Sequence, residues 1–296
     1  MKQALVIRPS GGMGGALAAE LLARGFRTTA LVGSERKKEK LNRRLEFGFK
    51  LETAVGKLTD VDVVSRAGEG ADAIFFHANT TYDEKANRAE SLRAAAAAAK
   101  RLGIRLVALD GVYRALHPSY ERELAAVAAE FPETVTAVRL PEVYGASARN
   151  TVLYYTLKKL ARGEPGVWFG DPDAPREYAY LTDAAKVAVD LADAEPAFPG
   201  RIRRMTGFGQ IGANGLLDIA RAAVGAEAKL KKASGWQLAA LQLWDGRVKE
   251  LKAGIRFVPE RESDEEGAAE VRPKAVTPYE RGIRETLAEL AKRSGS

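Results

Sequence analysis

The stretch Ala4-Leu-Val-Ile-Arg-Pro-Ser-Gly-Gly-Met-Gly14, which continues into an alanine- and leucine-rich run up to Gly25, decides the fold. A short apolar run, a glycine cluster, a helix-forming segment and a second apolar run at 26–32 make the pattern of one βαβ unit. Because glycine has no Cβ, backbone amides in such a turn can approach a pyrophosphate, and the positive end of the following helix favours an anion. The stretch therefore predicts a nucleotide-binding turn; the alternative is a tight strand-to-helix turn without a ligand.

The length and composition are those of a globular protein with a large core. The chain has 296 residues, of which 46% are hydrophobic and 29% charged, enough for an α/β core with a smaller lobe. It contains no cysteine, which excludes disulfides, thiolate metal sites and a cysteine nucleophile. Its two histidines, His77 and His117, argue against a structural zinc site, so we expect no metal.

Charge and hydropathy bear on location and partners. No apolar run reaches the roughly 20 residues that span a bilayer, and a strand follows Met1 directly, so we expect a cytoplasmic protein. The net charge is +7, but basic residues alternate with acidic ones, as in 36–44, which is typical of a solvated helix. We therefore expect a small-molecule substrate and neither nucleic acid nor membrane as a partner; the positive charge suits an anionic nucleotide.

Strands and helices alternate up to about residue 145. We expect further strands at 49–55, 73–77, 105–109 and 135–139, and helices at 35–46, 86–101 and 119–131. This alternation predicts an α/β fold, a Rossmann-type doubly wound parallel sheet, with residues 1–145 as the dinucleotide-binding core.

After that point the rhythm changes, and we expect a smaller C-terminal α/β substrate lobe in 146–296, mixed with returning core elements. The pattern predicts helices at 151–161, 182–194, 216–224 and 237–251 and strands near 167–169 and 177–180. We expect Thr277 to cap a last helix with Pro278 in its first position.

Several motifs in this order resemble those of a known family. They are Ser10-Gly-Gly-Met-Gly14, Gly56-Lys-Leu-Thr-Asp60, Phe76-His-Ala78, Asn87, Arg139-Leu-Pro-Glu-Val-Tyr-Gly145, Arg176-Glu-Tyr-Ala-Tyr-Leu-Thr-Asp183 and Thr277-Pro-Tyr-Glu-Arg-Gly-Ile283. The series resembles the extended short-chain dehydrogenase/reductases, in particular the NAD-dependent epimerase/dehydratase branch. The resemblance implies a Rossmann core that binds NAD(P), a C-terminal substrate lobe and a homodimer formed through the helices at 86–101 and 119–131.

The cofactor motif departs from the family in ways that bear on the choice of cofactor. Arg8 stands where the family has its first glycine, and it can either narrow the turn or reach a phosphate. After the second strand, Gly33 and Ser34 offer no acid to the ribose hydroxyls, and Arg36, Lys37 and Lys38 follow; the charge of Glu35 opposes this interpretation. A 2′-phosphate prefers cations and a hydroxyl, so we expect NADP(H) rather than NAD(H). The expected cofactor residues are Arg8, Ser10, Gly11, Gly12, Met13, Gly14, Ser34, Arg36, Lys37, Lys57, Leu58, His77 and Ala78.

The catalytic positions depart further. The family uses a serine or threonine after the fifth strand and a Tyr-x-x-x-Lys on the next helix, whose lysine lowers the tyrosine pKa. Here Asp110 or Gly111 falls near the serine position, and the fourth residue after Tyr120 is Leu124, so the lysine is absent. The candidate proton carriers are Tyr120, Tyr113, Asp110 and His117. The alternative for His117 is a loop residue that only precedes a proline.

In the C-terminal half, Tyr154 and Tyr155 stand four residues before lysines, but after the sixth strand, so we expect a packed helix face there. The expected substrate contacts are Asn79, Tyr144, Asn150 and Arg176, with Tyr144 either facing substrate or packing. The three tryptophans, Trp168, Trp236 and Trp244, either form an aromatic wall or belong to the lobe core.

The sequence thus leads to an NADP(H)-dependent oxidoreductase or epimerase-like enzyme that acts on a carbonyl or carbinol carbon, with a sugar nucleotide as one such substrate. Two alternatives remain: a non-catalytic NADP(H)-binding sensor or scaffold, and a non-redox isomerase or lyase on the same fold. We expect Gly14→Val to abolish nucleotide binding by obstructing the path of the pyrophosphate.

Overall fold

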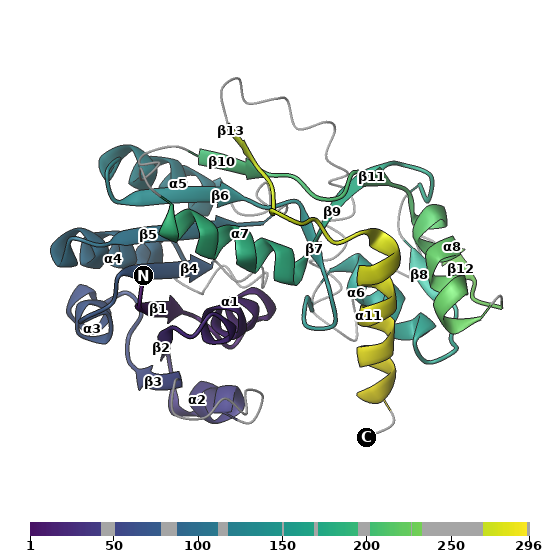
Figure 1. Cartoon of the computed structure of the whole chain (residues 1–296), viewed down its shortest axis with the longest axis horizontal. Helices are drawn as coiled ribbons and strands as arrows, with labels where there is room; N and C mark the ends of the chain where they lie inside the picture. The colour runs from purple at the N-terminus through teal and green to yellow at the C-terminus, as the bar shows by residue number, and fades with distance from the viewer. Residues whose placement is uncertain are drawn as a thin grey trace. The chain divides into compact units, whose positions relative to one another are not determined.

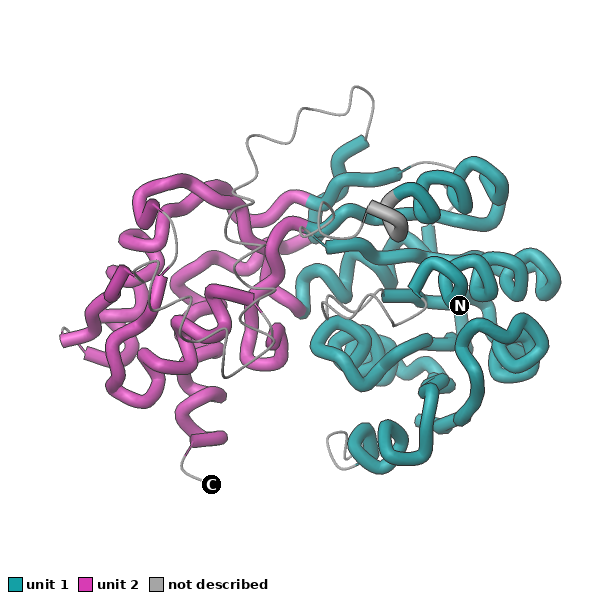
Figure 2. Tube along the Cα trace, turned by 180° about the vertical axis from the view of Figure 1, so that it is seen from behind, with its two compact units in different colours: residues 1–140, 182–205, 266–273 teal, residues 141–181, 206–265, 274–296 magenta. Residues whose placement is uncertain are grey.

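The computed structural model describes residues 1–42, 51–77, 88–111, 118–149, 151–168, 171–194, 202–225, 227–232 and 269–294. The chain forms two compact units (Figure 2). Unit 1 comprises residues 1–140, 182–205 and 266–273, and unit 2 comprises 141–181, 206–265 and 274–296.

Unit 1 is built on an eight-stranded sheet with the strand order β13-β10-β6-β5-β4-β1-β2-β3, visible in Figure 1. Every neighbouring pair in it is parallel. The strands are β1 (Gln3–Ile7), β2 (Arg27–Val32), β3 (Leu51–Val55), β4 (Ala73–His77), β5 (Arg105–Asp110), β6 (Val135–Arg139), β10 (Ile202–Met205) and β13 (Ala269–Val271). The predicted doubly wound parallel sheet is confirmed.

The helices of unit 1 are α1 (Gly12–Ala23), α2 (Glu35–Asn42), α3 (Val61–Ala67), α4 (Arg88–Leu102), α5 (Pro118–Glu130) and α7 (Leu181–Asp193). Helices α3, α4 and α5 pack side by side. Their apolar residues share one buried cluster with alternate strand residues, among them Leu5, Ile7, Ile74 and Phe76. Successive strand residues face opposite sides of a sheet, so this alternation buries one whole face under the three helices.

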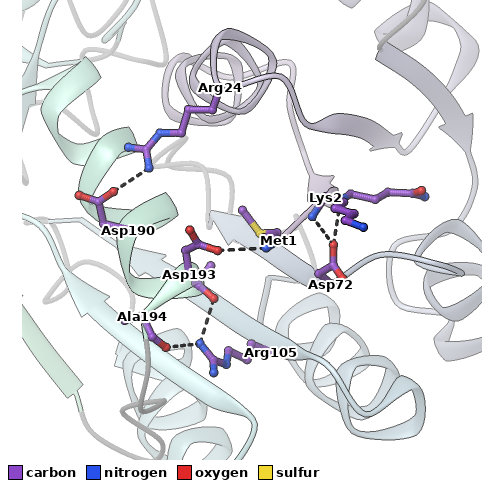
Figure 3. A network of polar contacts seen from close by, with 10 residues as sticks. Met1, Lys2, Arg24, Asp72, Arg105, Asp190, Asp193 and Ala194 are labelled. Carbon is purple, nitrogen blue, oxygen red and sulfur yellow. Dashed lines mark hydrogen bonds and ion pairs between the residues drawn. The ribbon is translucent and has the colours of Figure 1, made fainter.

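Polar contacts fix α7 against the beginning of the chain within unit 1 (Figure 3). The Arg24 guanidinium of α1 pairs with Asp190 of α7 at 2.6 Å. At the end of α7, Arg105 of β5 donates to the carbonyl oxygens of Ala192 and Ala194, at 3.0 and 2.6 Å. These contacts explain how a helix from residues 181–193 returns to a sheet whose other helices precede residue 131.

Unit 2 contains the strands β7 (Glu142–Tyr144), β8 (Gly166–Trp168), β9 (Arg176–Tyr180), β11 (Gln210–Ile211) and β12 (Leu230–Lys232), and the helices α6 (Val152–Leu160), α8 (Ala213–Val224) and α11 (Tyr279–Lys292). The strands form two small sheets, β11-β9-β7 and β12-β8. A separate aromatic-rich cluster, which includes Tyr144, Tyr178 and Tyr279, forms its core.

Some sequence-based boundaries were wrong. Helix α8 begins at Ala213, three residues before the predicted start at 216. The N-cap of α11 is Pro278, without a side-chain capping bond, so Thr277 is not the cap. Strand β10 was not predicted, because Ile202-Arg-Arg-Met205 has no alternation of apolar and polar residues. Its Arg203 is buried in the structure. The predicted helix at 237–251 lies outside the described residues. Within the described residues, no helix has the length and apolar character to cross a membrane.

Candidate dinucleotide site

The site is set by the point at which the strand order of unit 1 reverses. From β1 the chain moves outward through β2 to β3, and from β4 it moves outward in the other direction through β5 and β6. In open α/β sheets, ligands bind outside the carboxyl ends of the strands at this switch point. Because Ile7 pairs with Phe76 at the end of β1, the next residues, Arg8 and His77, stand at the switch point.

The N-terminus of α1 opens at the same edge. Its N-cap is Gly11, with φ −83° and ψ 173°, and no side chain there caps the first amides. The first turn of α1 contains no acidic residue. Met13 is buried, so this residue offers only its backbone to a ligand. An uncapped helix N-terminus without a nearby acid fits the pyrophosphate of a dinucleotide.

Arg8 has a left-handed backbone conformation, of the kind that favours glycine. Its φ is 62°, which is uncommon for a residue with a side chain. Its amide donates to the carbonyl of Leu31 at 3.1 Å, and its guanidinium donates to the Ser91 hydroxyl of α4 at 3.3 Å. The β1–α1 turn is thus joined by one side chain to the beginning of α4.

Gly14 has a different role from the one we expected. A Cβ at Gly14 would lie 2.5 Å from the carbonyl oxygen of Arg8 and 2.7 Å from the Cα of Pro9. A side chain there would therefore meet the protein's own turn before it met a ligand. The physical reason for this glycine is the close approach of α1 to the turn, a role that the last glycine of dinucleotide-binding turns also has.

Basic side chains lie beyond the end of β2. The Lys37 amine and the Leu58 side chain both come within 3.9 Å of the position that a Cβ on Gly33 would take. Partial desolvation and the positive charges of Arg8 and Arg36 lower the pKa of Lys37. The opposing acid, Glu35, pairs with Lys38 at 3.6 Å. Lys57 is exposed at the end of β3, and so this half of the edge carries a positive charge that suits phosphate.

His77 is buried at the end of β4, with 6% of its surface exposed. Burial, followed by the positive charges of Arg8 and Arg88, lowers the pKa of His77 to about 3. The imidazole is therefore neutral at physiological pH. Arg88 and Ser91, in the first turn of α4, are 6% and 1% exposed. Neither residue was predicted from the sequence. A charged residue and a hydroxyl residue three positions apart, at the start of the helix that follows a buried strand, are the signal that could have indicated them.

The expected catalytic residues are only partly described. Asp110 is buried at the end of β5, and its Oδ1 accepts a hydrogen bond from the Gly111 amide at 2.8 Å. Leu124, where the family lysine would stand, is fully buried in the apolar cluster of unit 1. Tyr120 belongs to α5, but its side chain lies outside the described part of the structure, as do Tyr113 and His117.

In unit 2, two of the expected substrate contacts, Tyr144 and Arg176, have different environments. Tyr144 is 1% exposed, and its ring packs against Tyr180 and Tyr279 with centroids 5.2 and 6.0 Å apart. Packing is therefore the correct interpretation of Tyr144, and the substrate contact was wrong. The Arg176 guanidinium lies over the indole of Trp168 at 5.6 Å. The positions of Ala78, Asn79 and Asn150 lie outside the described residues.

The tyrosines of the two tyrosine–lysine pairs of α6 pack in or against the core of unit 2. Tyr154 is buried in the unit 2 core, and Tyr155 packs against the same cluster. Lys159 pairs with Glu164 at 2.8 Å. The expected packed helix face is confirmed, and so is the core position of Trp168, which is buried in the same cluster. Trp236 and Trp244 are not among the described residues.

The helices that the resemblance assigns to a dimer interface carry charged groups on their outer sides. Arg93 of α4 pairs with Glu123 and Glu130 of α5, at 2.5 and 2.7 Å. These are pairs within one chain, and the homodimer stays a prediction.

Comparison with known proteins gives the same fold. Residues 10–139 match a family model described as NAD(P)H-binding. UDP-glucuronic acid 4-epimerase from Bacillus cereus, solved with UDP-glucuronic acid and NAD, has a TM-score of 0.70 at 12% identity, covering 98% of this chain and 99% of that one. UDP-glucose 4-epimerase from Thermotoga maritima, solved with UDP-glucose, gives 0.68 at 17% identity, over 99% and 100% of the two chains.

A third structure, dTDP-glucose 4,6-dehydratase from Bacillus anthracis in complex with NAD, gives a TM-score of 0.67 at 12% identity, over 100% of this chain and 98% of that one. Among curated protein sequences, none matches. The resemblance noted in the sequence is confirmed at the level of the fold: residues 10–139 match the NAD(P)H-binding family model, and the chain has the fold of these epimerase and dehydratase structures.

Proposed function

We propose that the chain is an NADP(H)-dependent oxidoreductase or epimerase-like enzyme that acts on a carbonyl or carbinol carbon. The observation that carries the proposal is the basic edge of unit 1, where Lys37 lies beside Gly33 at the end of β2. In a site for NAD, an acid after the second strand would bind the ribose hydroxyls. A cation there suits the additional phosphate of NADP(H).

The residues of this edge divide between the parts of the cofactor. The amides at the start of α1, from Gly11 to Gly14, would hold the pyrophosphate. Ser34, Arg36 and Lys37 would hold the 2′-phosphate, and Leu58 would lie against the adenine beside Gly33. When bound, the nicotinamide ring supplies or accepts a hydride.

The proton must move on a carrier other than a lysine-activated tyrosine, because Leu124 is buried in the core. Asp110 stands at the end of β5, near the serine position of the family. Tyr113, His117 and Tyr120 follow it in sequence. Of these groups, a histidine titrates closest to neutral pH in its unperturbed state, and so His117 is the first residue to test.

A sugar nucleotide is the substrate class that the comparisons favour. The epimerases from Bacillus cereus and Thermotoga maritima were solved with UDP-glucuronic acid and UDP-glucose. In this chain, Arg176 stacks on Trp168, and the buried Nε of Arg176 has no hydrogen-bond partner among the described residues. A guanidinium held by its face presents its edge to a phosphate. We propose Arg176 as a contact for the substrate diphosphate.

The buried leucine also favours a second candidate, a non-catalytic NADP(H)-binding sensor. Leu124 is an apolar residue in the position of the lysine on which the family chemistry depends. A sensor would keep the binding edge and lose the proton carrier.

Two measurements on the purified chain separate these candidates. Calorimetric titration with NADPH and NADH tests the site, and we expect the tighter binding for NADPH. The absorbance of NADPH, followed in the presence of a panel of carbonyl compounds and sugar nucleotides, tests turnover. Oxidation of NADPH supports the enzyme, and binding without turnover of any compound supports the sensor. Failure to bind either nucleotide would overturn both proposals.

A further inference from the structure

Two neighbouring lysines at the start of α2 differ in their partners. The amides of Lys37 and Lys38 both donate to the carbonyl oxygen of Ser34, at 3.0 and 3.1 Å, so both residues stand in the first turn of the helix. The acid of this turn, Glu35, pairs with the amine of Lys38 at 3.6 Å. Among the described residues, the Lys37 amine has neither a hydrogen bond nor an ion pair. The acid in the turn thus serves one lysine and leaves the other.

The Lys37 amine is also partly removed from water. It lies 3.9 Å from the position that a Cβ on Gly33 would take, and the Leu58 side chain lies at the same distance from that point. An apolar neighbour and the positive end of a helix both disfavour an ammonium ion. The pKa of Lys37 is accordingly lowered, in the first place by partial desolvation. The side chain as a whole remains exposed, so a small reagent in solution can reach the amine.

A lysine amine in this environment is a nucleophile. Only the neutral amine has the lone pair that attacks a carbon atom, and desolvation without an acidic partner increases the neutral fraction. Lys38, which has its amine beside Glu35 in the same turn, is the natural comparison.

We propose that Lys37 is a modification site, at which acyl phosphates acylate the amine, and that this modification weakens the binding of NADPH. An acyl phosphate carries the kind of anionic group that Arg36 and Lys37 are proposed to hold, so the reagent is concentrated beside the amine. The amine forms a C–N bond to the acyl carbon and the C–O bond to phosphate breaks. The leaving phosphate takes the electron pair and the amine proton, and the product is an uncharged amide.

The inference rests on the proposed function and deepens it by adding regulation of the same site. Acylation removes the positive charge of Lys37 from the place proposed for the 2′-phosphate. NADPH should therefore bind about tenfold more weakly to the acylated chain, whereas NADH, which has no 2′-phosphate, should change much less. The modified protein would no longer distinguish the two cofactors.

The first measurement is the rate at which acetyl phosphate acetylates each lysine in the folded chain without nucleotide. Digestion after glutamate, followed by fragmentation in the mass spectrometer, assigns the acetyl group to Lys37 or Lys38. We expect Lys37 to react at least about threefold faster than Lys38, and than Lys159, which pairs with Glu164 at 2.8 Å. Saturating NADPH should slow the reaction of Lys37 but not that of Lys159.

The second measurement is the affinity for NADPH and NADH, by calorimetry, before and after treatment with acetyl phosphate. It compares the wild type with Lys37→Arg, which keeps a positive charge but has no amine to acetylate, while the other lysines react as they do in the wild type. Each chain is compared with itself before treatment. Treatment should weaken NADPH about tenfold in the wild type and less than about twofold in Lys37→Arg.

Two results would overturn the inference. Equal rates for Lys37 and Lys38 in the wild type would exclude the modification site; this measurement needs neither a variant nor a cofactor, so the proposed function would stand. Fast acetylation of Lys37 with the same change in NADPH affinity for the wild type and Lys37→Arg would overturn the regulation. It would also overturn the assignment of the 2′-phosphate to Lys37, and so the two failures are distinguishable.

Discussion

The carbonyl oxygen of Arg8 lies 2.5 Å from the position that a Cβ atom on Gly14 would occupy. Contact at that distance forces the backbone of the turn or of α1 to move, so we expect Gly14→Ala to destabilise the protein by about 1–3 kcal/mol. Gly15 is the matched control, because its nearest neighbour would be 3.6 Å away and alanine favours a helix. Thermal unfolding checks this, and equal melting temperatures for the two variants would show that the turn is not tightly packed.

The positive φ of Arg8 predicts an order of stability for two substitutions. Arg8→Gly and Arg8→Ala both remove the hydrogen bond to Ser91, but only glycine adopts φ 62° without a steric cost. We expect the glycine variant to be more stable than the alanine variant by about 1 kcal/mol in urea unfolding. A more stable alanine variant would contradict the left-handed conformation of this residue.

Lys37 should discriminate between the two nicotinamide cofactors. Its amine lies beside Gly33 at the end of β2, so Lys37→Ala should weaken NADPH about tenfold and NADH much less. Lys38→Ala is the control, since that amine pairs with Glu35 on the same helix and should affect the two cofactors alike. Equal losses for NADPH and NADH in Lys37→Ala would refute the assignment of the 2′-phosphate to this lysine.

His77 should contribute to acid sensitivity. Its pKa is lowered to about 3 in the folded protein, from about 6.5 in the unfolded chain, so the unfolded chain takes up the proton first as the pH falls. The folded state therefore loses up to about 1.4 kcal/mol per pH unit between about pH 6 and pH 4, relative to a variant without this group. Urea unfolding of the wild type and of His77→Gln across this pH range measures the difference in stability. Parallel pH profiles of the free energy of unfolding would mean that His77 takes up a proton in the folded protein as readily as in the unfolded chain.

In unit 2, the hydroxyl of Tyr279 joins α11 to strand β9 and to the residue that precedes β11. It accepts from the Tyr178 amide at 3.1 Å and donates to the Gly209 carbonyl at 2.5 Å. Tyr279→Phe leaves these buried groups without their partner, so we expect a loss of about 1–3 kcal/mol in the free energy of unfolding. Tyr180→Phe removes an exposed hydrogen bond to Glu285 and should cost less than about 1 kcal/mol. A loss in Tyr279→Phe as small as that of Tyr180→Phe would be inconsistent with the buried network.

The fold of unit 1 was predictable because its strands are short apolar runs and its turns carry glycine. Val135–Arg139 and Ala73–His77 form strands with the bounds expected from the sequence. The sheet is completed by Ile202–Met205 and Ala269–Val271, and these strands were not predicted. Strands this short, with charged residues inside them, show no apolar alternation. They form because of their neighbours in the sheet, since β10 pairs with β6 and β13 pairs with β10.

For the candidate site, the residue types in the sequence indicated which edge of the sheet would bind a nucleotide, but not which side chains contact one another there. The glycines of the turn and the basic residues after β2 could be predicted as cofactor contacts from their spacing in the sequence, because their role depends on the local backbone. The reason for Gly14 could not, because the atoms that it would meet belong to Arg8 and Pro9 in a folded turn. Arg88 and Ser91 escaped notice because a charged residue in a helix is usually exposed, and only the fold buries these two.

The central claim is that a nicotinamide dinucleotide binds across the turn after β1. Hydrogen exchange of the intact chain, measured by mass spectrometry with and without NADPH, tests it most directly. We predict slower exchange in the segments 8–14 and 33–37 when NADPH is added, with little change in α11. Unchanged exchange in both segments at NADPH concentrations that saturate binding, or no binding of any pyridine nucleotide to the folded chain, would contradict the claim.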